Sequence, residues 1–148
     1  MRCAVSAGLW PILCVGETRE ERDRGTTRAV VESQVREGLR RLAAHEMTTV
    51  TIAYEPVWAI GTGQAATPAQ AVEVHRLIRE QVAGEFVPPD LHAFRVLYGG
   101  SVTPETAPAF IAEPEVDGFL VGGASLTAAT FAQIVHAVQR AKDHHTEG

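Results

Sequence analysis

A glutamate followed by a glycine-containing loop is the part of this sequence best suited to chemistry. The segment Ala53–Gly63 reads AYEPVWAIGTG, and its Glu55 comes just after the β-branched run Thr48–Ile52, which predicts a strand. Pro56 biases the backbone of Glu55 towards extended conformations. Gly61 leaves a bare backbone whose N–H groups can approach an anion closely. The pattern indicates a fixed acid or base beside a loop that could fold over a ligand, although an ordinary turn with an exposed glutamate has the same local pattern.

Three other apolar runs are each closed by glycine. They are Pro11–Val15 before Gly16, Phe94–Tyr98 before Gly99-Gly100, and Gly118–Val121 before Gly122-Gly123. Continuous apolar runs of this kind predict parallel strands that are buried on both faces. Ligands of parallel α/β folds bind at the carboxyl ends of the strands. The glycine pairs therefore predict a phosphate cradle made of backbone N–H groups, or else tight turns. The sequence contains neither a GxGxxG nor a Walker pattern, so a dinucleotide or a nucleoside triphosphate is not favoured.

Amphipathic patterns place a helix after each predicted strand. The clearest begins with the capping box Thr67–Gln70, has Pro68 at its first position, buries Val74, Ile78 and Val82, and ends at Gly84. Other helices are predicted over residues 1–8, from Thr26 or Thr27 through Val31, Val35, Leu39 and Leu42, from Thr103-Pro104, and around Phe131, Ile134, Val135 and Val138. The charged segment Glu17–Arg24 is predicted to be a solvated turn or short helix. The alternation predicts an α/β fold of four parallel βα units.

The composition excludes several classes of protein. The chain has 148 residues, 45% apolar and 21% charged, which suits one packed domain or a piece of a larger one. A net charge of −5 without a basic stripe argues against nucleic-acid binding. No apolar run is long enough to span a bilayer, and no signal peptide is apparent. Cys3 and Cys14 have no metal-binding or CxxC spacing. We predict that both are small buried thiols in a reducing compartment, which favours the cytoplasm.

Four motifs together resemble one enzyme family. ILCVGET (Ile12–Thr18), AYEPVWAIGTG, LYGGSV (Leu97–Val102) and DGFLVGGASL (Asp117–Leu126) resemble, in the same order, strands five to eight of the (β/α)8 barrel of triosephosphate isomerase. The resemblance covers nearly the whole chain. It implies that residues 1–148 form the C-terminal half of a TIM barrel, truncated within the fourth helix. It also implies an isomerase of glycolysis and gluconeogenesis, a cytoplasmic homodimer when complete, that interconverts dihydroxyacetone phosphate and glyceraldehyde 3-phosphate without metal or cofactor.

The resemblance assigns roles residue by residue. Glu55 matches the catalytic base, which moves a proton through an enediolate intermediate. The positions that match the substrate phosphate site are Gly61, Ser101, Gly122 and Gly123. The positions that match loop hinges are Pro56, Val57 and Trp58 at one end and Gln64, Ala65 and Ala66 at the other. Tyr98 matches the residue that holds the closed loop, and Ile60 and Leu120 match an apolar clamp over the base.

The sequence departs from the family in one important respect. The family's other catalytic groups, an Asn, a Lys and a His, lie in the half of the barrel that has no counterpart here. This sequence has no Asn, and its only lysine is Lys142 near the end of the last predicted helix. None of the histidines follows a predicted strand, so we predict that they are solvated helix or tail residues; they are His45, His75, His92, His136, His144 and His145.

Three interpretations remain open from the sequence. The chain could be a truncated triosephosphate isomerase, whose missing N-terminal half-barrel supplies the absent groups. It could be a half-barrel that pairs with itself or with a separate N-terminal half. It could also be a non-catalytic phosphate-binding half-barrel. In each case we expect a small triose phosphate or phosphate ligand, a tendency to form homo-oligomers, and no nucleic-acid or membrane partner.

Overall fold

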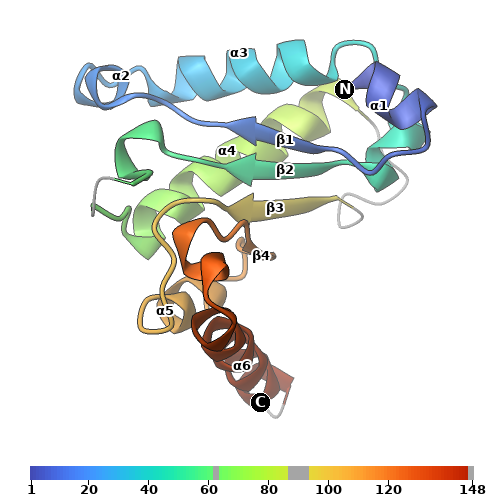
Figure 1. The fold of residues 1–148 in the computed structure, drawn as a ribbon. Coiled ribbons are helices and arrows are strands. Elements are labelled where there is room, and N and C mark those ends of the chain that lie inside the picture. Colours follow the sequence, from blue (N-terminus) through green and yellow to red (C-terminus); the bar gives the residue numbers. More distant parts are fainter. Residues whose placement is uncertain (62–63, 87–93, 147–148) are drawn as a thin grey trace.

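The computed structural model describes residues 1–61, 64–86 and 94–146 and contains one sheet of four parallel strands (Figure 1). The strands are β1 (Ile12–Val15), β2 (Thr51–Tyr54), β3 (Arg95–Tyr98) and β4 (Gly118–Phe119). Their order in the sheet is their order in the chain, so β1 and β4 are the two edges. Because all four strands are parallel, their carboxyl ends meet at one edge of the sheet. The predicted fold of four parallel βα units, half of a TIM barrel, is confirmed.

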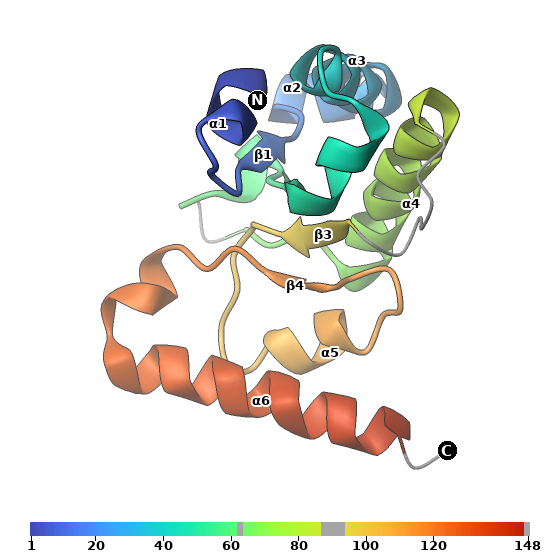
Figure 2. The same cartoon turned by 90° about the vertical axis from the view of Figure 1, so that its right-hand side faces the viewer.

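Helices connect the strands and wrap around one side of the sheet (Figure 2). The α-helices are α1 (Arg2–Ser6), α2 (Arg19–Asp23), α3 (Thr27–Leu39), α4 (Pro68–Glu85), α5 (Ala107–Ile111) and α6 (Ala128–Thr146). Short 3₁₀ helices are η1 (Ala44–Thr49), η2 (Val57–Ala59) and η3 (Gly123–Leu126). Helix α3 packs against α4, and α5 packs against α6. This arrangement leaves the carboxyl ends of the strands accessible.

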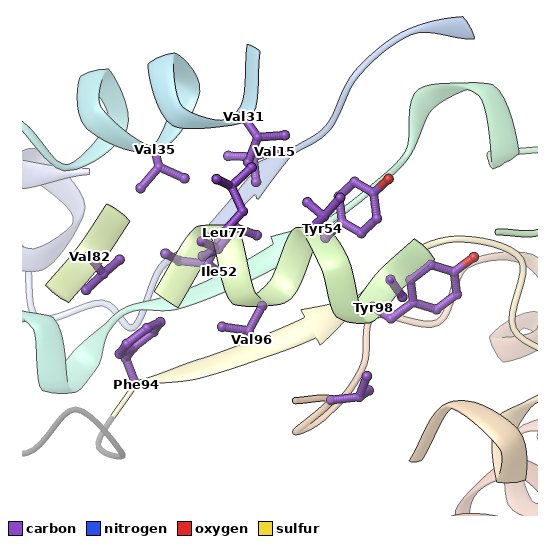
Figure 3. Packing of buried hydrophobic residues seen from close by; sticks show 14 of the residues in the cluster. Val15, Val31, Val35, Ile52, Tyr54, Leu77, Val82, Phe94, Val96 and Tyr98 are labelled. Atoms are coloured by element: carbon purple, nitrogen blue, oxygen red, sulfur yellow. The ribbon is translucent and has the colours of Figure 1, made fainter. Parts of the chain in front are cut away.

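The core lies between the sheet and helices α3 and α4 (Figure 3). The predicted stripes are confirmed: Val31, Val35 and Leu39 of α3 and Val74, Ile78 and Val82 of α4 are all buried. They pack with strand residues that include Val15, Ile52 and Val96. The predicted capping box is also present, because the Thr67 hydroxyl accepts a hydrogen bond from the Gln70 N–H and the Gln70 side chain accepts one from Thr67. Helix α4 thus begins at a residue that the sequence specifies.

Several predicted boundaries are wrong. The segment before Glu55 forms η1 through Thr49, and β2 begins only at Thr51. Helix α4 continues past Gly84 to Glu85. Helix α5 begins at Ala107, because the Thr103 hydroxyl and carbonyl cap a preceding turn instead of a helix. Strand β4 covers two residues, although the N–H of Leu120 still donates to the Tyr98 carbonyl. The predicted loop at 87–89 lies outside the described residues.

The prediction that strands are buried on both faces is wrong for β1. Ile12 is 45% exposed, and Cys14 is exposed together with Cys3, which contradicts the predicted buried thiols. The physical reason is that β1 is an edge strand and the helices cover one side of the sheet. In α6, Ile134 is buried but the predicted core residues Phe131 and Val135 are 43% and 48% exposed, because this helix packs on one face against α5 and η3.

His75 on α4 is fully buried, which contradicts the prediction that every histidine is solvated. Its Nδ1 lies 2.9 Å from the carbonyl oxygen of Glu115, and because a carbonyl only accepts, Nδ1 carries the hydrogen. Its Nε2 is buried without a hydrogen-bond partner among the described residues. Burial, with the nearby Arg79 guanidinium as a smaller cause, lowers the pKa of His75 to about 4. His75 is therefore neutral at pH 7, and its ring packs edge-on against Tyr54, the last residue of β2.

The buried His75 predicts a pH-dependent stability. Its pKa is lower in the folded chain than in the unfolded one, so the unfolded chain binds more protons between pH 6.5 and about 4. The contribution of the neutral His75 to the free energy of unfolding should be complete above pH 6.5. It should fall by about 3 kcal/mol as the pH drops to 4. Urea unfolding of His75→Gln should show a smaller slope with pH, whereas the exposed His136→Gln control should keep it. Equal slopes in both variants would contradict this assignment.

The described residues contain no helix that is both long and apolar enough to cross a membrane. Within the same part of the chain, no group of three or more His, Cys, Asp or Glu side chains is arranged to hold a metal ion.

Candidate functional site

Glu55 lies in the middle of a row of three residues at the carboxyl ends of β1, β2 and β3. Val15, Tyr54 and Tyr98 are paired in register. The residues that follow them are Gly16, Glu55 and Gly99, respectively. The Glu55 N–H donates to the Val15 carbonyl at 2.7 Å, and the Gly99 N–H donates to the Tyr54 carbonyl at 2.8 Å. The peptide group between Tyr54 and Glu55 is thus held by ladder hydrogen bonds to both neighbouring strands, and the Glu55 side chain is half-buried.

One cavity of about 350 Å³ opens beside this row. Its lining combines the Glu55 side chain, Ile60 and Gly61 with two backbone segments, 99–103 and 120–124. The structure therefore brings seven predicted site residues together around one cavity: Glu55, Ile60, Gly61, Ser101, Leu120, Gly122 and Gly123. None of the described residues that line it is a lysine or arginine. An anion in this cavity would meet backbone N–H groups.

The other four predicted residues, Pro56, Val57, Trp58 and Tyr98, do not line the cavity but lie at the two ends of the loop that does. At the first end, η2 follows Pro56 and contains Trp58, whose indole N–H donates to the Glu17 carboxylate at 3.0 Å. At the second end, the Ala66 N–H donates to the Tyr98 hydroxyl at 3.3 Å. Burial raises the pKa of Tyr98, so its hydroxyl stays neutral and can accept this bond. Both ends of the loop are tied to buried groups.

Glu17 is the largest omission of the sequence prediction, which placed it in a solvated segment. Its side chain is 0% exposed, and its carboxylate accepts hydrogen bonds from the Tyr54 hydroxyl at 3.1 and 3.2 Å. It also accepts hydrogen bonds from the Trp58 indole N–H and from an Arg22 guanidinium nitrogen at 2.9 Å. Burial, followed by the negative charge of Glu17, raises the pKa of Tyr54 far above its ordinary value. Glu17 therefore connects the end of β1, the end of β2 and the first turn of the loop.

Local sequence explains how Arg22 reaches Glu17. Thr18 is the N-cap of α2, and a complete capping box with Glu21 starts the helix immediately after Glu17. Arg22 then lies one helical turn further on, above the carboxylate and close to the Trp58 ring. The sequence signal for this cluster was a glutamate shortly after a strand, followed by the helix N-cap Thr18 and by an arginine five residues after the glutamate. It was hidden among the alternating charges of the segment.

Cys14 is a second group that the sequence prediction did not place at the site. Shielding by neighbouring atoms, followed by the negative charge of Glu55 and a hydrogen bond to its carboxylate, raises the pKa of the Cys14 thiol. Cys14 is thus a neutral thiol beside the Glu55 carboxylate. Because a raised pKa keeps the thiol protonated, this cysteine is suited to contact the carboxylate and poorly suited to act as a nucleophile.

Comparison with known proteins identifies the chain's relatives. The family model described as "Triosephosphate isomerase" matches residues 1–138. Among curated proteins, the chain is 52% identical over 134 residues to the triosephosphate isomerase of Trichlorobacter lovleyi, covering 90% of this chain and 53% of the relative. It is 53% identical over 135 residues to that of Carboxydothermus hydrogenoformans, covering 91% of this chain and 54% of the relative.

The chain spans about half the length of the curated relatives it matches. The match nevertheless covers most of the chain, including all four strands and the cavity-lining segments. The chain therefore belongs to the triosephosphate isomerase family.

Proposed function

We propose that this chain supplies the catalytic base and the phosphate-binding wall of a triosephosphate isomerase, which interconverts dihydroxyacetone phosphate and glyceraldehyde 3-phosphate. The observation that carries the proposal is the single cavity that joins the Glu55 carboxylate to the backbone of two glycine-rich turns. A triose phosphate needs both features, because a base must reach the carbon next to the carbonyl while the phosphate binds some distance away. The reaction belongs to glycolysis and gluconeogenesis in the cytoplasm.

Glu55 is the proposed base. In the mechanism established for triosephosphate isomerases, a glutamate removes the proton next to the substrate carbonyl and a neutral group polarises that carbonyl. The proton then returns to the neighbouring carbon, so the aldehyde and ketone exchange places through an enediolate. Glu55 suits this role because its backbone is fixed in the sheet and its carboxylate faces the cavity. No atom of this step requires a metal or an organic cofactor.

The phosphate is proposed to bind Gly61, Ser101, Gly122 and Gly123 through backbone N–H groups. Glycine suits these positions because a bare backbone can approach an anion closely. Gly61 has a φ of +67°, a conformation that glycine adopts without strain, and lines the same cavity as Gly122 and Gly123. The side chains of Ile60 and Leu120 line the same cavity and are proposed to shield the base from water.

The loop after Glu55 is proposed to close over the substrate. Its first hinge is Pro56, Val57 and Trp58, anchored to Glu17, and its second is Gln64, Ala65 and Ala66, anchored to Tyr98. Closure would dry the cavity and strengthen the interactions of the carboxylate with the substrate.

The reaction also needs an electrophile, the group that polarises the substrate carbonyl. We propose that a second half-barrel, the N-terminal half, supplies it, because no Lys, His or Asn lies among the described residues that line the cavity. The exposed apolar side chains support such a partner. Leu9, Trp10 and Ile12 are exposed at the β1 edge, and Leu126, Phe131 and Val135 are exposed beyond the β4 edge. A half-barrel that pairs with both edges would bury both groups and leave no open strand.

Two alternatives assign the same surfaces differently. A second copy of the chain could pair with both edges and give a homo-oligomeric barrel with two Glu55 residues. A chain without any partner would be a non-catalytic phosphate-binding half-barrel, which the lack of an electrophile in the cavity favours. The family homodimer is a further level of assembly that the proposed complete barrel would form.

Inorganic phosphate should bind the cavity even without catalysis. In a titration followed by NMR, we expect the largest shifts in the amide signals of residues 99–103 and 121–126. The cavity is lined by residues 99–103 and 121–124, so a bound anion acts directly on the N–H groups of these segments or of the residues that follow them. Chloride at equal ionic strength is the control and should leave these signals in place. Phosphate shifts spread evenly over α4 and α6, with none in the two turns, would refute the proposed site.

A further inference from the structure

The Glu55 side chain occupies space that almost any other residue at position 99 would fill. A Cβ built on Gly99 would lie 2.5 Å from Glu55 Cγ, 3.0 Å from Oε1 and 3.2 Å from Cδ. Contacts below 3.0 Å between carbon atoms are not tolerated, so one of the two side chains would have to move. Gly99 is buried and held by its ladder hydrogen bond to Tyr54, which leaves Glu55 as the group that moves.

The backbone of Gly99 does not itself require glycine. The described glycines with positive φ are Gly8, Gly25 and Gly61, so Gly99 has a φ that alanine can adopt. Gly16, which lies on the other side of Glu55, needs to be glycine for a different reason. A Cβ on Gly16 would lie 1.8 Å from the carbonyl oxygen of Glu55, a backbone atom that cannot turn away. Gly16 is therefore needed for the pairing of β1 with β2, whereas Gly99 is needed for the side chain of Glu55.

We propose that Gly99 is a positioning residue for Glu55: the space left by its missing side chain accommodates the Glu55 side chain and sets where its carboxylate lies at the wall of the cavity. The inference rests on the proposed role of Glu55 as the base, because only then does the position of this carboxylate matter for catalysis. Gly99→Ala would displace the Glu55 side chain from this space while leaving the strand pairing intact.

The reactivity of the Cys14 thiol can report the position of the Glu55 carboxylate. In a Cys3→Ser background it is the only thiol of the chain, and its alkylation by iodoacetamide can be followed against pH. Glu55 is the charged group that acts on this thiol, so Glu55→Gln should move the alkylation midpoint to lower pH. Gly99→Ala should also move it, because displacing the carboxylate changes its distance from the thiol. In the Glu55→Gln background, Gly99→Ala should cause no further shift. Gly84→Ala is the matched control, since a Cβ there meets nothing within 4 Å.

A midpoint that Gly99→Ala leaves unchanged, while Glu55→Gln shifts it, would overturn the proposal, as would an equal Gly99→Ala shift in the Glu55→Gln background. Thermal unfolding provides a second readout if Gly99→Ala is poorly folded. The melting temperature lost in Gly99→Ala should be largely recovered in Glu55→Ala/Gly99→Ala, because the clash is with the Glu55 side chain. No recovery would also overturn it. Neither readout uses substrate or phosphate, so a failure here is distinct from a failure of the proposed isomerase function.

Discussion

Glu55→Gln is expected to lower kcat for glyceraldehyde 3-phosphate by about 10² to 10⁴-fold in a complete barrel, the range that a positioned general base contributes. The complete barrel can be assembled by co-expressing this chain with the N-terminal half of the Trichlorobacter lovleyi relative. The glutamine amide cannot accept the proton, but it keeps the size of the side chain between Gly16 and Gly99. KM should change little, because the proposed phosphate wall consists of backbone that the substitution does not touch.

The control for this prediction is Glu73→Gln, which changes an exposed carboxylate on α4 outside the cavity and should leave both kcat and KM in place. A Glu55→Gln barrel that retains kcat within a few-fold of the parent would show that another group removes the proton. A rise in KM with kcat unchanged would instead assign Glu55 to substrate binding.

Glu17→Ala is expected to lower the free energy of unfolding by about 3–5 kcal/mol, the effect of breaking a buried ion pair by removing one partner. The substitution leaves the Tyr54 hydroxyl, the Trp58 indole N–H and the Arg22 guanidinium without their common acceptor. Such a loss is comparable to the whole stability of many domains, which is about 5–15 kcal/mol. It should also release the first end of the loop, since Trp58 loses its bond to Glu17.

Urea unfolding followed by tryptophan fluorescence measures this effect. Glu32→Ala is the matched control, because Glu32 forms an i,i+4 pair with a largely exposed Arg28, and such pairs contribute less than about 1 kcal/mol. If Glu17→Ala were no more destabilising than Glu32→Ala, the buried cluster would not hold the end of β1, the end of β2 and the loop together.

The sequence predicted the parts of the fold that depend on local pattern. Four apolar runs and the Thr67–Gln70 cap identified the strands and the start of α4, since periodicity and capping are encoded in neighbouring residues. The cavity could also be anticipated. Glycines after Tyr98 and Val121 and a glutamate after Tyr54 must meet when the strands are parallel.

The rest could not be predicted because it depends on what covers each side chain. Glu17 and His75 are polar residues in charged or helical segments, and only the three-dimensional contacts with Tyr54 and with the Glu115 carbonyl explain their burial. Conversely, Ile12 is apolar but exposed, because it belongs to an edge strand. Apolar runs specify which residues can be buried, whereas the neighbouring elements decide which of them are.

The most direct test of the account is an isomerase assay of the 148-residue chain alone and after titration with the N-terminal half-barrel of a relative. The chain carries the proposed base and phosphate wall, but no electrophile lies among the described residues of its cavity. We expect no isomerisation of glyceraldehyde 3-phosphate by the chain alone, and turnover that grows with added N-terminal half and disappears with Glu55→Gln. Steady-state turnover by the chain alone, abolished by Glu55→Gln, would contradict the account, because the base and phosphate wall would then suffice without a second half.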